Sequence, residues 1–503
     1  MRNSISIKIA MFVALCFAAV LNGKASTNIV LNSDNLQAAI NAASPGDTLV
    51  LQPGTYMQNL VFTNPLTFLC GVTAISNQPV NLGGTVQIQG AGASFFQQIT
   101  FLNSVGVQCT GTVSFVKCLF QNPVTTFGAT LLSSSNTFQS SVAVDLSTGA
   151  TTNLQAYDTS FGTLTINGGK VLLKRCQITG AFGGPSVQPP CNAQGASTLI
   201  SLGLNGTALE AIRLTTSYGI NGTAGGGAPI TIIQSQLSQS GANTSVNPPI
   251  NLTSNKVWMG YNKVFGPIHL NGCDSVLIGN SVWGAGFPGW QWGPGWAIGD
   301  LQCSGGTVKA YNNLFVDMFV GVPAADVCAD TLVQLHSLAF GGAEFANNTF
   351  YGAGTALAAD NNFPVTLRGD AIYGSVGGGS ALWDISYCVF NNTPGVGAPF
   401  ACIVSDPGFV NAGDSGNPPD FWLKTNSVCI GNGPPSPIYN NRGTTNRNNI
   451  GFTGGPFYNP ANSTNQNPMV YLLTGTPQAG KELIFPIGRT NIMTLNAAAA
   501  AGN

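Results

Sequence analysis

The chain is 503 residues long, and only 7% of its residues are charged, against roughly 25% in ordinary soluble domains. Its 17 basic and 18 acidic residues nearly balance, which argues against a nucleic-acid or polybasic membrane partner. With 44% hydrophobic residues the chain is not of the disordered class, and polar uncharged residues with 64 glycines must solvate its surface. So weakly charged a surface favours self-association.

Residues 1–25 have the features of a secretory signal. Arg2 and Lys8 give a positive start, the run 9–21 is a short apolar core, and small residues precede Ser26. No run in the chain has the length of a comfortable membrane span. Removal of the signal would leave 14 of the 17 basic residues against 18 acidic ones. We therefore expect an exported, soluble chain with no transmembrane segment.

The stretch 35–56 predicts one short helix followed by strands and tight turns. NLQAAINAA (35–43) has helical spacing of its apolar residues. SPGDTLVLQPGTY (44–56) then places four strand residues between two Pro-Gly turns.

Further along, short runs repeat one pattern: a small polar residue or Cys, then any residue, then a large apolar one. The copies are KCLF (117–120), SNTF (135–138), DTSF (158–161), RCQI (175–178), GNSV (279–282), NNLF (312–315), NNTF (347–350) and YCVF (387–390). Repeats of this length, rich in strands and glycine turns, are typical of a solenoid. Inward Asn side chains would then hydrogen-bond to the next rung. Cys118, Cys176 and Cys388 would fill the core rather than form disulfides.

The opening NLQAAINAASPGDTLVLQPGTY resembles the N-terminal cap and first coil of secreted right-handed parallel β-helix proteins of the pectin lyase-like superfamily. Segments 405–413, 420–433 and 449–456 resemble their closing coils. The resemblance implies an all-β fold, a single-stranded right-handed parallel β-helix over 26–456 with an N-terminal capping helix. The signal 1–25 would precede it, and a tail of linker and short strands, 457–503, would follow. Activity stays open, because this superfamily holds lyases, hydrolases, esterases, adhesins and inert fibres.

Later copies of the repeat are further apart, so either a rung lacks the pattern or long loops project from the coils. Three intervals qualify: 283–306, 316–342 and 351–381. The first interleaves four tryptophans with Gly and Pro: Trp283, Trp290, Trp292 and Trp296. Flat indoles with N–H donors suit sugar rings, which makes this loop a candidate binding site for a polysaccharide or cell-surface glycan. The alternative is a loop that buries its own indoles.

The second and third intervals hold the candidate catalytic residues Asp317, Asp326, Asp330, Arg368 and Asp370. Paired carboxylates could serve as acid and base in glycoside hydrolysis. Several Asp could instead hold Ca²⁺, with Arg368 as the base or as the partner of a uronate. The structural alternative is a set of isolated, solvated loop residues.

Motifs of the enzymes in the superfamily are missing from this chain. His269 is followed by Leu270 where polygalacturonase-like hydrolases have an HG dipeptide, and Gln58 stands where pectin methylesterases carry Glu. The sequence therefore predicts a secreted or cell-surface solenoid with a structural or glycan-binding, adhesin-like role.

Two other functions stay open. One is a polysaccharide lyase or glycoside hydrolase with a divergent site in the long loops, with calcium as the cofactor of a lyase. The other is a self-assembling extracellular fibre or coat subunit, in which residues 457–503 would join neighbouring molecules.

Overall fold

The computed structural model divides into two compact units, residues 1–182 and 183–503, and each unit is described by itself. In the first unit the structure describes residues 25–70, 79–146 and 153–179. In the second unit it describes residues 202–205, 208–216, 220–223, 229–238, 250–253, 256–266, 268–283, 301–316, 331–338, 341–360, 362–378, 381–412, 420–435, 447–455, 469–472 and 497–500.

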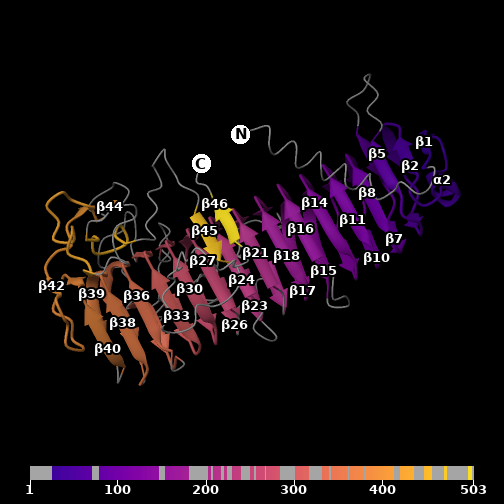
Figure 1. Ribbon diagram of the computed structural model, residues 1–503. Coiled ribbons are helices and arrows are strands. Elements are labelled where there is room, and N and C mark those ends of the chain that lie inside the picture. The colour runs from indigo at the N-terminus through magenta and orange to yellow at the C-terminus, as the bar shows by residue number, and fades with distance from the viewer. Residues whose placement is uncertain are drawn as a thin grey trace, which may run out of the picture. The chain divides into compact units, whose positions relative to one another are not determined.

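The first unit is a parallel β-helix whose strands stack into three faces (Figure 1, indigo to purple). Face I consists of β1 (Thr27–Val30), β2 (Thr48–Leu51), β5 (Thr67–Cys70), β8 (Ala93–Gln97), β11 (Thr112–Val116), β14 (Thr130–Ser134), β16 (Asn153–Tyr157) and β18 (Lys170–Lys174). Face II consists of β3 (Gly54–Tyr56), β6 (Val80–Leu82), β9 (Ile99–Phe101), β12 (Leu119–Phe120), the starts of β15 (Thr137–Asp145) and β17 (Ser160–Asn167), and β19 (Gln177–Ile178). Face III consists of β4 (Leu60–Phe62), β7 (Val86–Gly90), β10 (Val105–Cys109), β13 (Val124–Phe127) and the ends of β15 and β17.

Each later coil of this unit turns from face I to face II at a single residue with positive φ. These residues are Gln98, Lys117, Ser135, Asp158 and Arg175, with φ between 50° and 56°. The residue that follows each of them is buried: Ile99, Cys118, Asn136, Thr159 and Cys176. The turn therefore fixes which side chain enters the core, and the repeat seen in the sequence begins at this inward position.

Two positions after the inward residue, buried phenylalanines of four successive coils form a continuous stack along face II. The ring centroids of Phe101 and Phe120 are 4.6 Å apart, those of Phe120 and Phe138 are 4.4 Å apart, and those of Phe138 and Phe161 are 5.1 Å apart. Rings this close, with nearly parallel planes, add a specific contact to the free energy of burial. The stack fixes the register of successive coils.

Helix α2 (Leu36–Ala42) lies where the sequence predicts a helix. The side chain of Asn35 caps it by accepting from the N–H of Ala38, and Leu36 and Ile40 are buried. Gln37 contacts both backbone groups of Val61 in β4: its Oε1 accepts from the N–H at 2.7 Å, and its Nε2 donates to the carbonyl at 3.0 Å. The helix is thus held to the first strand of face III.

The second unit repeats the three-faced coil (Figure 1, magenta to orange). Face I consists of β21 (Ala208–Ile212), β24 (Pro229–Ile233), β27 (Lys256–Gly260), β30 (Asp274–Ile278), β33 (Thr307–Tyr311), β36 (Ala343–Ala346), β38 (Pro364–Arg368) and β40 (Leu382–Ser386). Face II consists of β22 (Thr215–Thr216), β25 (Gln236–Ser238), β28 (Lys263–Phe265), β31 (Ser281–Trp283), β34 (Leu314–Val316), the starts of β37 (Thr349–Ala359) and β39 (Ala371–Gly377), β41 (Val389–Phe390) and β42 (Ile403–Val404). Face III consists of β20 (Leu202–Asn205), β23 (Ile220–Thr223), β26 (Ile250–Thr253), β29 (Ile268–Asn271), β32 (Leu301–Ser304), β35 (Thr331–His336) and the ends of β37 and β39.

An asparagine ladder runs through the core of the second unit, as the sequence predicts. The side-chain amide of Asn262 donates to Oδ1 of Asn280 at 2.9 Å, and the same bond recurs from Asn280 to Asn313 and from Asn313 to Asn348. Each asparagine also donates to a backbone carbonyl of face I. Their buried amides therefore have their donors and acceptors satisfied, and the ladder links one coil to the next.

The cysteines of the repeat are core residues, as predicted. Cys118, Cys176 and Cys388 are buried and unpaired by disulfides. Burial raises the pKa of Cys118 to about 12 and that of Cys176 to about 11, so both remain neutral thiols at ordinary pH.

The described residues between 405 and 455 do not continue the stack as closing coils, which corrects the implication of the sequence resemblance. Among the strands that the structure describes, the stack ends at β42, and β43 (Phe409–Asn411) then pairs antiparallel with β44 (Asp420–Leu423). Phe409 and Phe421 pack on Tyr351 of face II, with ring centroids 6.1 and 5.0 Å away. These residues cover an apolar outer surface of face II, because their own large apolar side chains need a partner.

The C-terminal tail contains one described strand pair. β45 (Met469–Leu472) pairs antiparallel with β46 (Ala497–Ala500), so the alanine run forms a strand. Among the described residues, no helix is long and apolar enough to cross a membrane.

Candidate functional site

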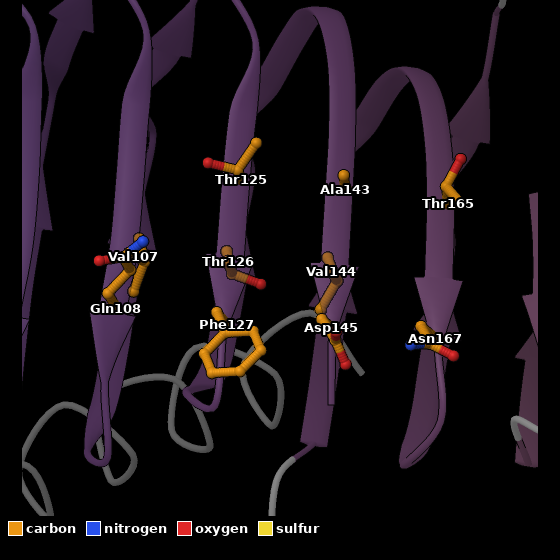
Figure 2. A pocket seen from close by; sticks show the side chains of 10 residues that line it. All are labelled: Val107, Gln108, Thr125, Thr126, Phe127, Ala143, Val144, Asp145, Thr165 and Asn167. Atoms are coloured by element: carbon orange, nitrogen blue, oxygen red, sulfur yellow. The ribbon is translucent and has the colours of Figure 1, made fainter. Parts of the chain in front are cut away.

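A shallow groove lies on the outer surface of face III in the first unit (Figure 2). The strand register places Gln108, Phe127, Asp145 and Asn167 in one row across β10, β13, β15 and β17. Thr125, Ala143 and Thr165 form a second row beside it. The hollow between the side chains has a volume of about 280 Å³. It is therefore an open groove across several strands and not an enclosed cavity.

The groove combines one aromatic surface with uncharged hydrogen-bonding groups. The side chain of Phe127 is 50% exposed although it is a large apolar residue. Gln108 and Asn167 offer amides, and Thr125 and Thr165 offer hydroxyls. Aromatic faces beside such polar groups are suited to sugar rings, which have apolar C–H faces and polar hydroxyls.

The only charged side chain among the ten that line the groove is Asp145. It stands between Phe127 and Asn167 in its row, because the register pairs it with both. A carboxylate at this place repels an anionic ligand. Hence the groove chemistry favours a neutral ligand over a polyuronate.

The strands hold the groove side chains at a regular spacing. Neighbouring parallel strands lie about 4.7–4.9 Å apart, so successive groove side chains recur at that interval. The inward neighbours Val107 and Val144 are buried and anchor the same strands to the core. A site built on such paired strands is preorganised for an extended ligand with repeating units.

Of the four tryptophans predicted to bind ligand, the structure describes Trp283. Trp290, Trp292 and Trp296 lie outside the described residues. Trp283 is half-buried at the end of β31, where its Nε1 donates to Oγ of Ser281 at 2.7 Å. Its ring lies 6.1 Å from that of Phe421, next to the apolar cluster formed with residues 405–455. Ligand binding by this group of tryptophans stays a prediction.

Of the predicted catalytic residues, the structure describes Arg368 and Asp370, while Asp317, Asp326 and Asp330 lie outside the described residues. Asp370 has no exposed surface and occupies the ladder position next to Asn348. Its burial raises its pKa to about 7, although hydrogen bonds from Asn348 and Arg368 partly offset that effect. The guanidinium of Arg368 is instead at the surface, 3.4 Å from Asp384. The two side chains are not brought together, and their catalytic role stays a prediction.

In interval 351–381 the first of the two alternatives holds: a rung that lacks the pattern, and not a long loop, separates the copies. Strands β37, β38 and β39 occupy most of it as a regular coil. The rung was missed because GDAI (369–372) carries Asp where other copies have Asn, Cys or Thr.

Segments 284–300 and 317–330 are outside the described residues, but the strands on either side of them stack in register. β31 pairs with β34 where the segments begin, and β32 pairs with β35 where they end. The strands that flank the two segments therefore pair on neighbouring rungs, and a surface shared by the segments stays a prediction.

Two further pairs of titratable side chains lie in or beside the intervals. Nδ1 of His336 lies 2.6 Å from Oδ2 of Asp360, and Nζ of Lys309 lies 3.9 Å from Oε2 of Glu344. Within the described part of the chain, no group of three or more His, Cys, Asp or Glu side chains could hold a metal ion. Calcium binding stays a prediction.

Sequence reasoning did not find the groove. Its residues sit at outward positions of strands, where no apolar periodicity marks them. Their alignment could have been obtained by counting from the inward positions Cys118, Asn136 and Thr159 to the outward positions on face III. Phe127 would then have been conspicuous as an aromatic residue at an outward position.

Comparisons with known proteins give one structural likeness. The crystal structure of pectate lyase Pel9A matches over 86% of this chain and 97% of that chain, with 14% sequence identity and a TM-score of 0.22. No family model matches the sequence. No curated protein matches it either.

Proposed function

We propose that this protein is a secreted or cell-surface β-helix protein that binds a neutral polysaccharide along the face III groove without cleaving it. The observation that carries the proposal is the exposed Phe127 in a row with Gln108, Asp145 and Asn167. The signal-like features of residues 1–25 support export. The Trp-rich segment 283–300 is a second proposed contact site.

The proposal also gives helix α2 the role of a cap over the first coil. The contacts of Gln37 with the N–H and carbonyl of Val61 support it, because they satisfy backbone groups on β4 that could otherwise pair with another chain.

The test is affinity electrophoresis of the purified chain through gels that contain a neutral glucan, a neutral mannan or polygalacturonate. Binding to a neutral polymer should retard the wild type, and Phe127→Ala should weaken that binding about tenfold, or about 1.4 kcal/mol. Phe400→Ala is the matched control, since Phe400 is also an exposed phenylalanine, 65% exposed, but lies in the second unit. Equal retardation of both variants and the wild type would contradict the groove as the binding site.

A second measurement separates binding from catalysis. Polymer length is followed by size-exclusion chromatography after incubation with the wild type, with calcium present. An unchanged polymer length is expected. Shortened polymer would overturn the non-enzymatic part of the proposal and direct attention to the segments that hold Asp317, Asp326 and Asp330.

A further inference from the structure

The ladder of the second unit ends in two cysteines on neighbouring rungs. After Asp370, the inward position of the next coil is Cys388, and that of the last coil is Cys402. The register of β41 and β42 pairs Val389 with Ile403, so the two cysteines that precede these residues are directly opposite each other. The N–H of Ile403 donates to the carbonyl of Cys388 at 2.9 Å, and the N–H of Cys388 lies 3.4 Å from Sγ of Cys402.

This spacing is compatible with a disulfide. Neighbouring parallel strands are about 4.7–4.9 Å apart, and disulfides join residues whose Cα atoms are about 4.4–6.8 Å apart. Both side chains occupy the same inward ladder position: Sγ of Cys388 donates to the carbonyl of Ser386 at 3.3 Å, and Sγ of Cys402 donates to the equivalent carbonyl of Phe400 at 3.5 Å. Of the eight cysteines that the structure describes, these two form the only pair on adjacent ladder rungs, and Cys402 alone is not buried.

We propose that Cys388 and Cys402 form a redox clasp, a disulfide that closes the last coil of the solenoid under oxidising conditions. A disulfide would stabilise this coil, because β42 has only two residues and is paired with β41 on one side. Phe400 and Val404 beside it are 65% and 55% exposed, so this terminal rung has little burial to hold it.

The two thiols differ in pKa and in burial, and this difference assigns their roles. The neighbouring thiol of Cys388 is the main cause that lowers the pKa of Cys402, whereas burial raises the pKa of Cys388 well above its usual value. The partly exposed Cys402 is therefore the thiolate that meets an external oxidant. Cys388 is reached only from within the protein.

The reaction is an exchange with a small-molecule disulfide such as oxidised glutathione. The thiolate of Cys402 attacks one glutathione sulfur, the glutathione S–S bond breaks, and the first glutathione thiolate leaves and takes up a proton. Cys388 then loses its proton, and its sulfur attacks that of Cys402 in the mixed disulfide, releasing the second glutathione thiolate. Two protein thiols are oxidised, and one glutathione disulfide is reduced to two glutathione molecules.

The test treats the purified full chain with oxidised glutathione, blocks free thiols, and digests it with a protease that cleaves after aromatic residues. Phe390 and Phe400 lie between the two cysteines. In the oxidised wild type, cleavage there should yield two peptides joined by a disulfide that a reductant separates. The joined peptide should be lost in Cys388→Ser and in Cys402→Ser but retained in Cys176→Ser, a control at another buried ladder cysteine.

A second readout does not depend on the folding of the Cys388 variant. Limited proteolysis of the native chain between residues 391 and 400 should be roughly 10- to 100-fold slower after oxidation, because the disulfide closes a short loop. Cys402→Ser should show no such protection. Absence of the joined peptide in the oxidised wild type, or linkage of Cys402 to any other cysteine, would overturn the proposal.

Discussion

Asn348 donates two hydrogen bonds to the same carboxylate oxygen of Asp370, one from its backbone N–H at 2.7 Å and one from its side-chain amide at 3.0 Å. The other oxygen accepts from the N–H of Arg368 at 3.0 Å. A carboxylate thus continues the asparagine ladder at a fully buried position. Such a position is costly for a charge, and it couples the stability of the second unit to pH.

We expect the wild type to become less stable as the pH rises from about 5 to about 7. The pKa of Asp370 is raised to about 7 in the folded chain, above the value of about 3.9 expected when unfolded. Between these values the folded state binds the proton and the unfolded state does not, so the free energy of unfolding falls with pH, by an amount on the order of a few kcal/mol. Above about pH 7 this dependence ends. Urea unfolding at several pH values measures it.

Asp370→Asn isolates this effect from other titrating groups. The variant loses the acceptor for the N–H of Arg368 and should be less stable overall. Its free energy of unfolding, however, should no longer decrease between pH 5 and 7. His269, whose pKa is lowered by burial, gives a contribution of the opposite sign that is common to both proteins. Parallel pH profiles for the wild type and the variant would contradict the raised pKa of Asp370.

Asn313→Ala should destabilise the second unit by about 3–5 kcal/mol. The substitution leaves the backbone N–H and the amide of Asn280 without their acceptor, and it removes the donor to the carbonyl of Leu277. Asn81→Ala is the control, because the exposed amide of Asn81 donates only a 3.3 Å bond to Thr55. It should change the free energy of unfolding by less than about 0.5 kcal/mol. Similar losses for both variants, in chemical denaturation, would mean that the ladder adds no stability.

Arg175→Gly and Arg175→Ala should differ although both remove the same ion pair. Arg175 contacts Asp158 with two hydrogen bonds, of 2.5 and 2.6 Å, and both residues have positive φ. The pair is more than a third exposed, so its loss should cost below about 1 kcal/mol. Alanine keeps the strain of the left-handed backbone and glycine removes it, so the glycine variant should be more stable than the alanine variant by about 1 kcal/mol. Thermal unfolding of the two variants measures this difference, and an alanine variant as stable as the glycine variant would contradict it.

The sequence predicted the parts of the fold that face inward, and the reason is physical. Inward positions must be filled by residues that pack or pair on the next rung, so Asn313, Asn348 and the large apolar residue two positions after each of them recur visibly. The ladder position of Asp370 was not predicted, because a buried carboxylate was not expected at a position that usually holds an amide. The ladder tolerates it, since its Oδ1 accepts from the N–H and the amide of Asn348 as the oxygen of an asparagine would.

Outward positions obey no such constraint, and this is why the groove was missed. Phe127 and Asp145 are neighbours only through the register of β13 and β15, and no residue pattern at these outward positions marks that register in the sequence. The sequence likewise does not show which strands Phe409 and Phe421 pack against. Their spacing fits a coil, but an antiparallel hairpin packed on Tyr351 buries them equally well.

Asp145→Asn should change which polysaccharide the groove accepts. The substitution keeps the size of the side chain and removes the one negative charge among the groove residues. Retardation by a neutral polymer should be nearly unchanged, because amides bind hydroxyls as carboxylates do. Affinity for polygalacturonate should rise by a few-fold at low salt, and the gain should shrink as salt screens the charges.

The control for this change is Asp384→Asn, which removes one negative charge at a side chain 64% exposed in the second unit. If only the net charge of the protein mattered, both variants would gain the same affinity for polygalacturonate in affinity electrophoresis. If Asp145 excludes anionic polymers from the groove, the gain belongs to Asp145→Asn alone. It should also disappear when Phe127→Ala is added, since the polymer then loses the aromatic surface on which its rings would rest.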